Sequence, residues 1–214
     1  MGPVKSRRSY HSSLREAQAG QTRVRILDAA QRLFAERGYA ATTMDSIASG
    51  AGVATDTVYA SFGNKAGVLH RLLDVRVGGD DAAVPLLERE GPQAVRAERS
   101  QKRQVLGFAA GIAEILERAR PVDEIMRGAA AADPEVAALR GRMQAMRFEN
   151  MKRFVSWLAA RGPLRSGMDE EEAAGIVWTL TSPEVHGLLR QDRGWSQDRY
   201  VSWLGDTLIR TVIP

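Results

Sequence analysis

The most constraining feature of this 214-residue chain is the stretch TMDSIASGAGVATDTVYASFGNK, which runs from Thr43 to Lys65. Apolar side chains at i, i+3, i+4 and i+7 predict that it opens with a short amphipathic helix. Those side chains belong to Met44, Ile47, Ala48 and Ala51. Gly50 and Gly52 lie at its end, and glycine supplies the backbone angles with which a chain reverses within a few residues. The stretch therefore predicts a helix followed by a tight turn.

A second short helix is predicted directly after this turn. Val58 and Phe62 are four residues apart, so they lie on the inward face of that helix. Four side chains are left facing outward, namely Thr55, Asp56, Thr57 and Tyr59. Short polar groups at an exposed helix N-terminus are the small donors and acceptors that meet base edges in the major groove of DNA. We therefore predict a helix-turn-helix in which this second helix is the recognition helix.

A longer segment, ILDAAQRLFAERGYAATTMDSIASGAGVATDTVYASFGNKAGVL, resembles the DNA-binding domain of the tetracycline-repressor (TetR) family and covers about a fifth of the chain. Its motifs follow a specific order: Phe-x-x-x-Gly-Tyr, Thr-Thr-x-x-x-Ile-Ala, Gly-Val-x-x-x-Thr-Val-Tyr-x-x-Phe, and Asn-Lys before an apolar helix. The resemblance implies an all-α fold of nine or ten helices. An N-terminal three-helix helix-turn-helix domain is followed in such a fold by a helical ligand-binding and dimerisation domain.

The resemblance also implies contacts with the DNA backbone. The family places a threonine at the Thr43 position and a lysine at the Lys65 position on phosphate, and we expect Tyr59 to contact phosphate as well. Phosphate contacts position a protein on DNA without reading its sequence. Helix capping explains Thr43 equally well, so both roles stay open for that residue.

Thr55, Asp56 and Thr57 are the residues that we expect near base edges. Asp56 is able to accept from a cytosine amino group, or instead to cap the helix and repel phosphate. The family often has serine where Ala54 stands and a small residue at the position of Asp56. Because of these departures, we do not assign individual bases to these side chains.

Charge is distributed unevenly along the chain. Residues 1–78 contain 11 Lys and Arg against 6 Asp and Glu, whereas residues 79–214 contain 19 against 20. The positive excess therefore lies with the expected DNA-binding half, and it favours a polyanionic partner such as a double-stranded DNA operator.

Three regions are expected from the order of signals. Residues 1–21 are interpreted as a flexible basic arm that allows a helix near residues 12–18 and either contacts DNA or is a solvated tail. Residues 22–78 form the helix-turn-helix domain, with Thr22 capping a first helix that ends at Gly38. Residues 79–214 form the ligand-binding and dimerisation domain, in which Ser100, Pro121 and the pair Asp133-Pro134 are expected to begin helices.

The helix after Asp133-Pro134 carries an apolar face with Asn150 near its centre. One interpretation is a core asparagine bonded to a neighbouring carbonyl, and the other is a polar anchor in an apolar cavity for a small effector. The candidate effector-binding residues are Phe108, Ile112, Met126, Met143, Met146 and Asn150.

The last two helices carry more apolar surface than one face can bury. Their apolar residues include Trp178, Leu180, Trp203 and Ile209. Surplus apolar surface of this kind favours a symmetric partner, and the resemblance implies a homodimer formed through these two helices.

Several functional classes find no support in the sequence. The chain has no cysteine, and His11, His70 and His186 are too far apart to form a recognisable metal motif. No phosphate loop, dinucleotide fingerprint or serine elbow is present, so we expect no cofactor, no metal and no catalytic residues. No apolar run approaches the ~20 residues that span a bilayer, and no export signal is evident, so we expect a cytoplasmic protein with no membrane partner.

These observations predict a ligand-responsive DNA-binding regulator. The favoured form is a repressor that a small, largely apolar molecule releases from a palindromic operator. A ligand-dependent activator uses the same linkage with the opposite sign. Two alternatives come from other classes of protein. One is a helical carrier or adaptor without a DNA role, and the other is an enzyme built on the helical domain, for which no set of residues suggests a reaction.

Overall fold

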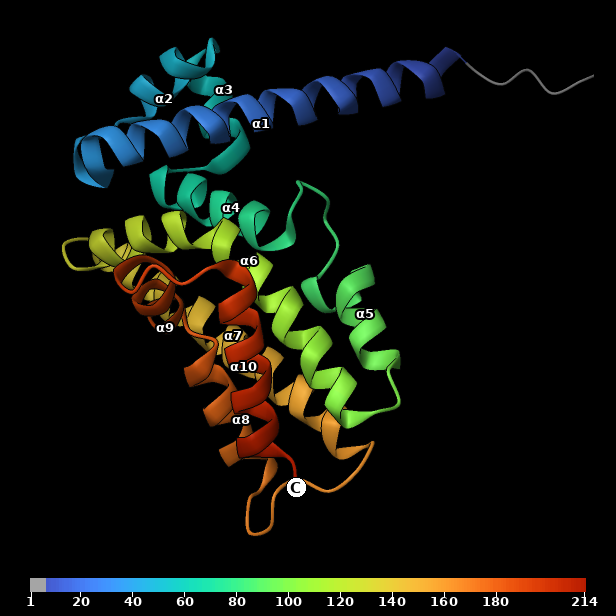
Figure 1. The fold of residues 1–214 in the computed structure, drawn as a ribbon. Helices are drawn as coiled ribbons and strands as arrows, with labels where there is room; N and C mark the ends of the chain where they lie inside the picture. Colours follow the sequence, from blue (N-terminus) through green and yellow to red (C-terminus); the bar gives the residue numbers. More distant parts are fainter. Residues whose placement is uncertain (1–6) are drawn as a thin grey trace, which may run out of the picture. The chain divides into compact units, whose positions relative to one another are not determined.

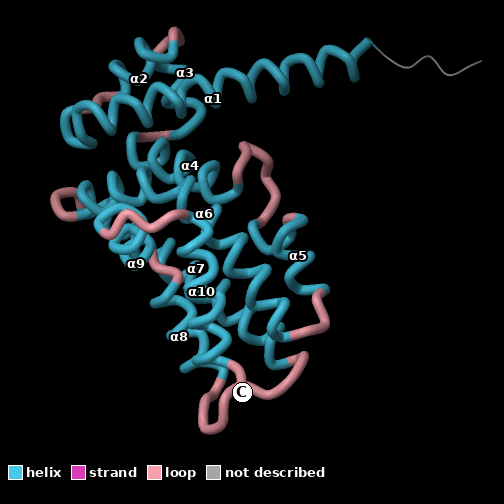
Figure 2. Tube along the Cα trace, viewed as in Figure 1, coloured by secondary structure: helices cyan, strands magenta, loops and turns pink. Residues whose placement is uncertain are grey.

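The computed structural model describes the backbone of residues 7–214 and the side chains from residue 18 onward. The described residues are helical and contain no strand (Figures 1 and 2). The chain forms two compact units, Met1–Val75 and Arg76–Pro214, and the division lies inside helix α4 (Lys65–Gly78). None of the described helices is both long and apolar enough to cross a membrane.

Helix α1 (Arg7–Ala41) begins well before Thr22, so the predicted start of the first helix is wrong. Residues 7–21 contain three Arg, two Ala and two Gln, which favour helix, and no proline that would stop one. Residues 7–21 therefore continue α1, which contains the helix allowed near residues 12–18, and residues 1–6 lie outside the described part of the chain. The predicted break at Gly38 is confirmed, because its φ of 77° interrupts the helical backbone.

Helices α2 (Met44–Ala51), α3 (Thr55–Phe62) and α4 complete the first unit. The predicted apolar stripe of α2 is buried, and so is Val58 of α3. Ile26, Leu33 and Phe34 of α1 are buried as well. Each short helix thus covers its apolar face inside the unit and leaves its polar face in solvent.

The second unit begins with the last turn of α4. A 3₁₀ turn, η1 (Leu86–Glu88), and α5 (Glu90–Ala97) come next, and they precede the long helices α6 (Gln101–Ala130) and α7 (Pro134–Ala159). The chain then forms α8 (Glu170–Leu180), α9 (Pro183–Gly187), a π-helical turn η2 (Leu188–Asp192) and α10 (Gln197–Val212).

Side-chain caps explain where most of these helices start. Each capping side chain accepts a hydrogen bond from a backbone N–H in the first turn, which satisfies a donor that has no partner within the helix. The caps of α6, α7, α8, α9 and α10 are Ser100, Asp133, Asp169, Ser182 and Ser196.

The predicted helix start at Pro121 is wrong, because α6 runs through this residue without interruption. Proline removes one hydrogen bond of the helix but does not prevent the next turn from forming. Leu116, Val122 and Met126 are buried on either side of it. Continuous burial of one face therefore outweighs the lost hydrogen bond.

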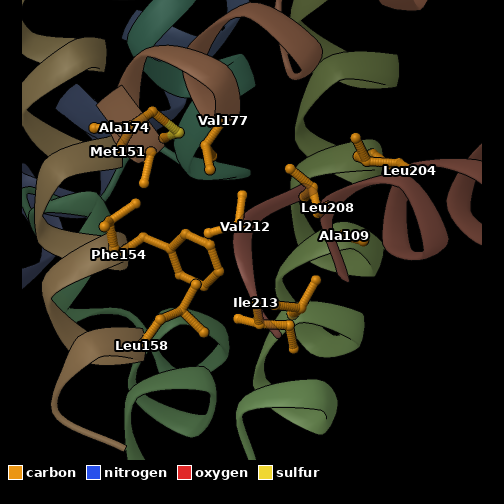
Figure 3. Packing of buried hydrophobic residues seen from close by; sticks show 14 of the residues in the cluster. Ala109, Met151, Phe154, Leu158, Ala174, Val177, Leu204, Leu208, Val212 and Ile213 are labelled. Carbon is orange, nitrogen blue, oxygen red and sulfur yellow. The ribbon is translucent and has the colours of Figure 1, made fainter. Parts of the chain in front are cut away.

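The core of the second unit lies among α6, α7, α8 and α10. Figure 3 shows Phe154 and Leu158 of α7 beside Val212 of α10, with Val177 of α8 next to them. Phe154 also stacks on Phe108 of α6 with ring centroids 3.7 Å apart. Aromatic and aliphatic packing thus joins the four helices into one body.

Candidate nucleic-acid interface and ligand cavity

The turn between α2 and α3 is fixed by capping at both ends of α2. The Thr43 hydroxyl accepts from the Ser46 N–H at 3.1 Å, and the Ser46 hydroxyl oxygen accepts from the Thr43 N–H at 3.0 Å. Gly52 ends α2 in the left-handed region, at φ 66°, and donates its N–H to the carbonyl groups of Ala48 and Ser49. Thr43 therefore has the predicted capping role, and its exposed position keeps a phosphate contact open.

Helix α3 presents a polar tip to solvent. Asp56 and Tyr59 are exposed, Tyr59 to 49%, while Thr57 is half-buried. The Thr55 hydroxyl donates to the Asp45 carboxylate at 2.8 Å, so Thr55 ties α3 to α2. Because Ala54 supplies no side-chain cap, the first backbone N–H groups of α3 lack a side-chain partner. The tip offers donors and acceptors of the kind that read DNA.

Lys65 has partners within its own unit. Its Nζ donates to the carbonyl oxygens of Tyr39 at 2.7 Å and Thr42 at 2.9 Å, and it lies 4.2 Å from the centre of the Tyr39 ring. The ammonium group thus holds the end of α1 to the start of α4. Sequence reasoning missed this role, because residues about 25 positions apart meet only in the folded unit.

A cavity of about 510 Å³ lies within the second unit, between the end of α4, η1, α5, α6 and α7. It brings together three of the candidate effector-binding residues, Phe108, Ile112 and Asn150. Asn150 is half-buried, and its side chain makes no hydrogen bond to any other described residue. The interpretation of Asn150 as a core asparagine bonded to a carbonyl therefore does not hold.

The other three candidates do not line this cavity. Met126 is fully buried in the core, Met143 is half-buried, and Met146 is 53% exposed. A helical stripe places residues on one face of α7 but does not say where along the axis a cavity opens, and Met146 lies one turn before Asn150. Phe154 and Trp157 line the cavity on the other side of Asn150. Both belong to the predicted apolar face of this helix. Choosing candidate residues on the C-terminal side of Asn150 would therefore have identified them.

The two guanidinium groups at the wall of the cavity are bound by neighbouring residues. Arg89 donates to both oxygens of Asp80 at 2.9 and 3.0 Å, and this hydrogen bonding raises the pKa of Arg89. Arg118 donates to the carbonyl oxygen of Arg76 in the last turn of α4 at 3.2 Å. Most of the remaining lining is aliphatic or aromatic, and the Asn150 side chain has no hydrogen-bond partner among the described residues.

A compact helix-turn-helix unit with an exposed polar tip, joined to a helical unit with an apolar cavity, defines a DNA-binding transcriptional regulator. Residues 26–72 match the family described as "Bacterial regulatory proteins, tetR family". The chain is 30% identical over 179 residues to the HTH-type transcriptional regulator TtgR of Pseudomonas putida, and the match covers 81% of each protein. The protein belongs to the TetR family of transcriptional regulators, which are not enzymes.

Two further similarities extend over nearly the whole chain. The HTH-type transcriptional repressor BepR of Brucella suis biovar 1 is 25% identical over 202 residues, which cover 92% of this chain and 94% of BepR. The structure of a SmeT–triclosan complex superposes with a TM-score of 0.70 at 24% identity, covering 91% of this chain and 92% of SmeT. SmeT is described as the repressor of a multidrug efflux pump of Stenotrophomonas maltophilia. At this level of identity, the similarity to the SmeT structure shows a shared fold.

Proposed function

We propose that the protein is a repressor that binds a palindromic operator as a homodimer and leaves it when a small, largely apolar molecule occupies the 510 Å³ cavity. The observation that carries the proposal is the pairing of this cavity with a helix-turn-helix in one chain. Helix α4 belongs to both units, so it is a continuous element through which occupancy can bias DNA binding. Its place of action would be the cytoplasm, where bacterial DNA lies.

The nature of the effector follows from the cavity wall. Phe108, Phe154 and Trp157 offer aromatic surface, and Asn150 offers one amide that fixes the orientation of a polar substituent. The relative SmeT forms a complex with triclosan, a small aromatic molecule, which supports an effector of this type. The name of BepR as a repressor supports the sign of regulation.

The homodimer is proposed to form through α8 and α10. Trp178 and Leu180 of α8 and Val201, Trp203 and Ile209 of α10 are only partly buried within one chain. Covering them with the same face of a second copy would remove further apolar surface from water. A two-fold axis then places two α3 helices in successive major grooves, with half-sites ~34 Å apart.

On the operator, Thr55, Asp56 and Thr57 are proposed to face base edges. Thr43, Tyr59 and Lys65 are proposed to contact phosphate, for which Lys65 has to exchange carbonyl partners for a phosphate oxygen. The exposed position of Asp56 and Tyr59 supports these assignments.

Gel-shift titration of genomic fragments at two salt concentrations tests the DNA role. We expect complexes that weaken as salt rises, because counterions are released on binding. Absence of any shift at low salt would leave the carrier or adaptor as the function.

The uncharged fluorophore N-phenyl-1-naphthylamine tests the cavity. We expect its fluorescence to rise on binding, Phe108→Ala to weaken binding, and Met146→Ala, outside the cavity, to leave it unchanged. Release of DNA on adding the probe supports a repressor, whereas tighter DNA binding identifies a ligand-dependent activator.

A further inference from the structure

A second, more polar cavity of about 300 Å³ lies between α6 and the α9–η2 segment. Four of its wall residues carry carboxylates and two carry guanidinium groups, so its charged wall is net acidic. The acidic residues are Asp123, Glu124, Glu184 and Asp192, and the basic ones are Arg120 and Arg127. None of them lines the apolar cavity of the proposed effector.

Asp123 is the unusual member of this wall. It is only 7% exposed, yet its carboxylate forms no hydrogen bond or ion pair with any described residue. Burial raises its pKa, and the more distant charges of Arg140, Arg127 and Arg147 oppose that rise without overcoming it. A buried carboxylate without a direct partner is unfavourable for folding, so its presence calls for a reason.

The arginines around Asp123 do not form an ion pair with it. Arg120 pairs with Glu124 at 2.8 Å, and Arg140 pairs with Glu184 at 3.1 Å. Arg147 donates to the carbonyl oxygen of Trp178 at 2.8 Å. Arg127 is exposed and makes no ion pair with Asp123. Among the described residues, no side chain therefore supplies Asp123 with a direct positive partner.

The opposite wall is an irregular segment. The residues of η2 form a π-helical turn, and Leu188 within it is 57% exposed. Single π turns are rare in proteins, and they occur frequently at functional sites. A π turn that faces a buried carboxylate without a partner is a second, independent sign of a binding site.

We propose that this second cavity binds a compact organic cation, whose ammonium or amidinium group donates hydrogen bonds to the carboxylate of Asp123. Glu124 and Glu184 are already paired with arginines, so Asp123 and Asp192 are the wall carboxylates left to attract such a group, and Pro183 and Leu188 cover its apolar part. A metal ion does not fit, because in the described part of the chain no three His, Cys, Asp or Glu side chains form a group that could hold one. The site is additional to the apolar effector cavity.

Benzamidine and benzamide form a matched pair of probes for this site. They share the size and shape of one planar ring, but only benzamidine carries a positive charge. In isothermal titration of the full chain we expect benzamidine to bind at least about tenfold more tightly, the lower end of the contribution of a charge-assisted hydrogen bond. Equal binding of the two probes, or binding of neither, would overturn the proposal.

Three variants locate the bound cation. Asp123→Asn keeps the shape of the side chain and should abolish the preference for benzamidine. Glu114→Gln removes one carboxylate from the same helix at the apolar cavity, and Asn150→Leu alters that cavity's polar group; both should keep the preference. Circular dichroism checks that each variant is folded.

The outcomes also separate the site from the apolar effector cavity. Loss of the preference in Asn150→Leu but not in Asp123→Asn would place the cation in the apolar cavity and refute the second site. Because neither DNA nor the naphthylamine probe enters the titration, its failure leaves the proposed function untouched.

Discussion

The two units keep their functional polar groups in opposite places. In the helix-turn-helix unit, Asp56 and Tyr59 project into solvent from a short helix whose back, Val58, is fully buried. In the second unit, Asn150 and Asp123 line cavities and have no hydrogen-bond partner among the described residues. The exposed end of α3 keeps its position only if the core behind it is fully packed. A cavity, in contrast, is a space that the packed core leaves unfilled. The first unit should therefore lose function when its core is damaged, and the second when its cavities are altered.

The largest expected effect is that of Ile47→Ala, which cuts into the fully buried core of the first unit. Removing a buried isoleucine side chain to alanine costs about 2–5 kcal/mol. We expect DNA binding to be lost, while the second unit still binds N-phenyl-1-naphthylamine. Parallel loss of probe binding would show that the two units do not fold independently, and Val24→Ala on the surface of α1 is the control.

Lys65→Ala should have the next largest effect, because the variant loses a proposed phosphate contact. We expect operator affinity to fall by about tenfold across related sequences, and the logarithmic salt dependence to decrease by about one unit per site. Competition binding with a randomised duplex pool at several salt concentrations measures both quantities.

The structure also gives Lys65 two strong carbonyl partners, so a purely structural role has a distinct signature. In that case the melting temperature falls but the salt dependence stays unchanged. A change in base preference without a change in overall affinity would refute the phosphate assignment.

Thr57→Ala should produce a smaller and different change. Loss of one hydroxyl contact to a base edge is expected to reduce discrimination at one operator position by about 1 kcal/mol, or about fivefold. Sequencing of the bound fraction of a randomised pool reveals this change. A uniform loss across all sequences would instead place Thr57 on the DNA backbone.

The Asp123→Asn variant should show the smallest effect, and we expect it to increase stability. Burial raises the pKa of Asp123 above its ordinary value of 3.8, so ionisation of this group opposes folding at neutral pH. Removing the charge should stabilise the protein by about 1 kcal/mol, which raises the melting temperature by about 2–4 °C.

The pH dependence of that stabilisation supplies the check. In the wild type, the ionised Asp123 carboxylate destabilises the folded state at neutral pH. As the pH falls through its raised pKa, the carboxylate takes up a proton more readily in the folded state than in the unfolded chain, and this destabilisation is lost. The difference between wild type and Asp123→Asn should therefore shrink in acid. A variant that is less stable than wild type at neutral pH would show that Asp123 has a stabilising partner.

Local sequence signals were enough to specify the helix-turn-helix in detail. The burial of Met44, Ile47 and Val58, the cap at Thr43 and the turn at Gly52 all follow from signals within about twenty residues. Helix periodicity, capping and glycine conformations depend on neighbours in the chain, which is why these features could be predicted. The starts of α6 at Ser100 and of α7 at Asp133-Pro134 were predictable for the same reason.

Packing between distant helices settled the other features. It kept α6 helical through Pro121, placed the Lys65 ammonium group against carbonyl groups at the end of α1, and left Met126, Met143 and Met146 outside the 510 Å³ cavity. It also placed Asp123 of α6 beside Glu184 of α9 at a cavity for which the sequence contains no motif. Cavities and long-range hydrogen bonds depend on how helices far apart in the chain pack against one another, and periodicity within one helix carries no information about that packing.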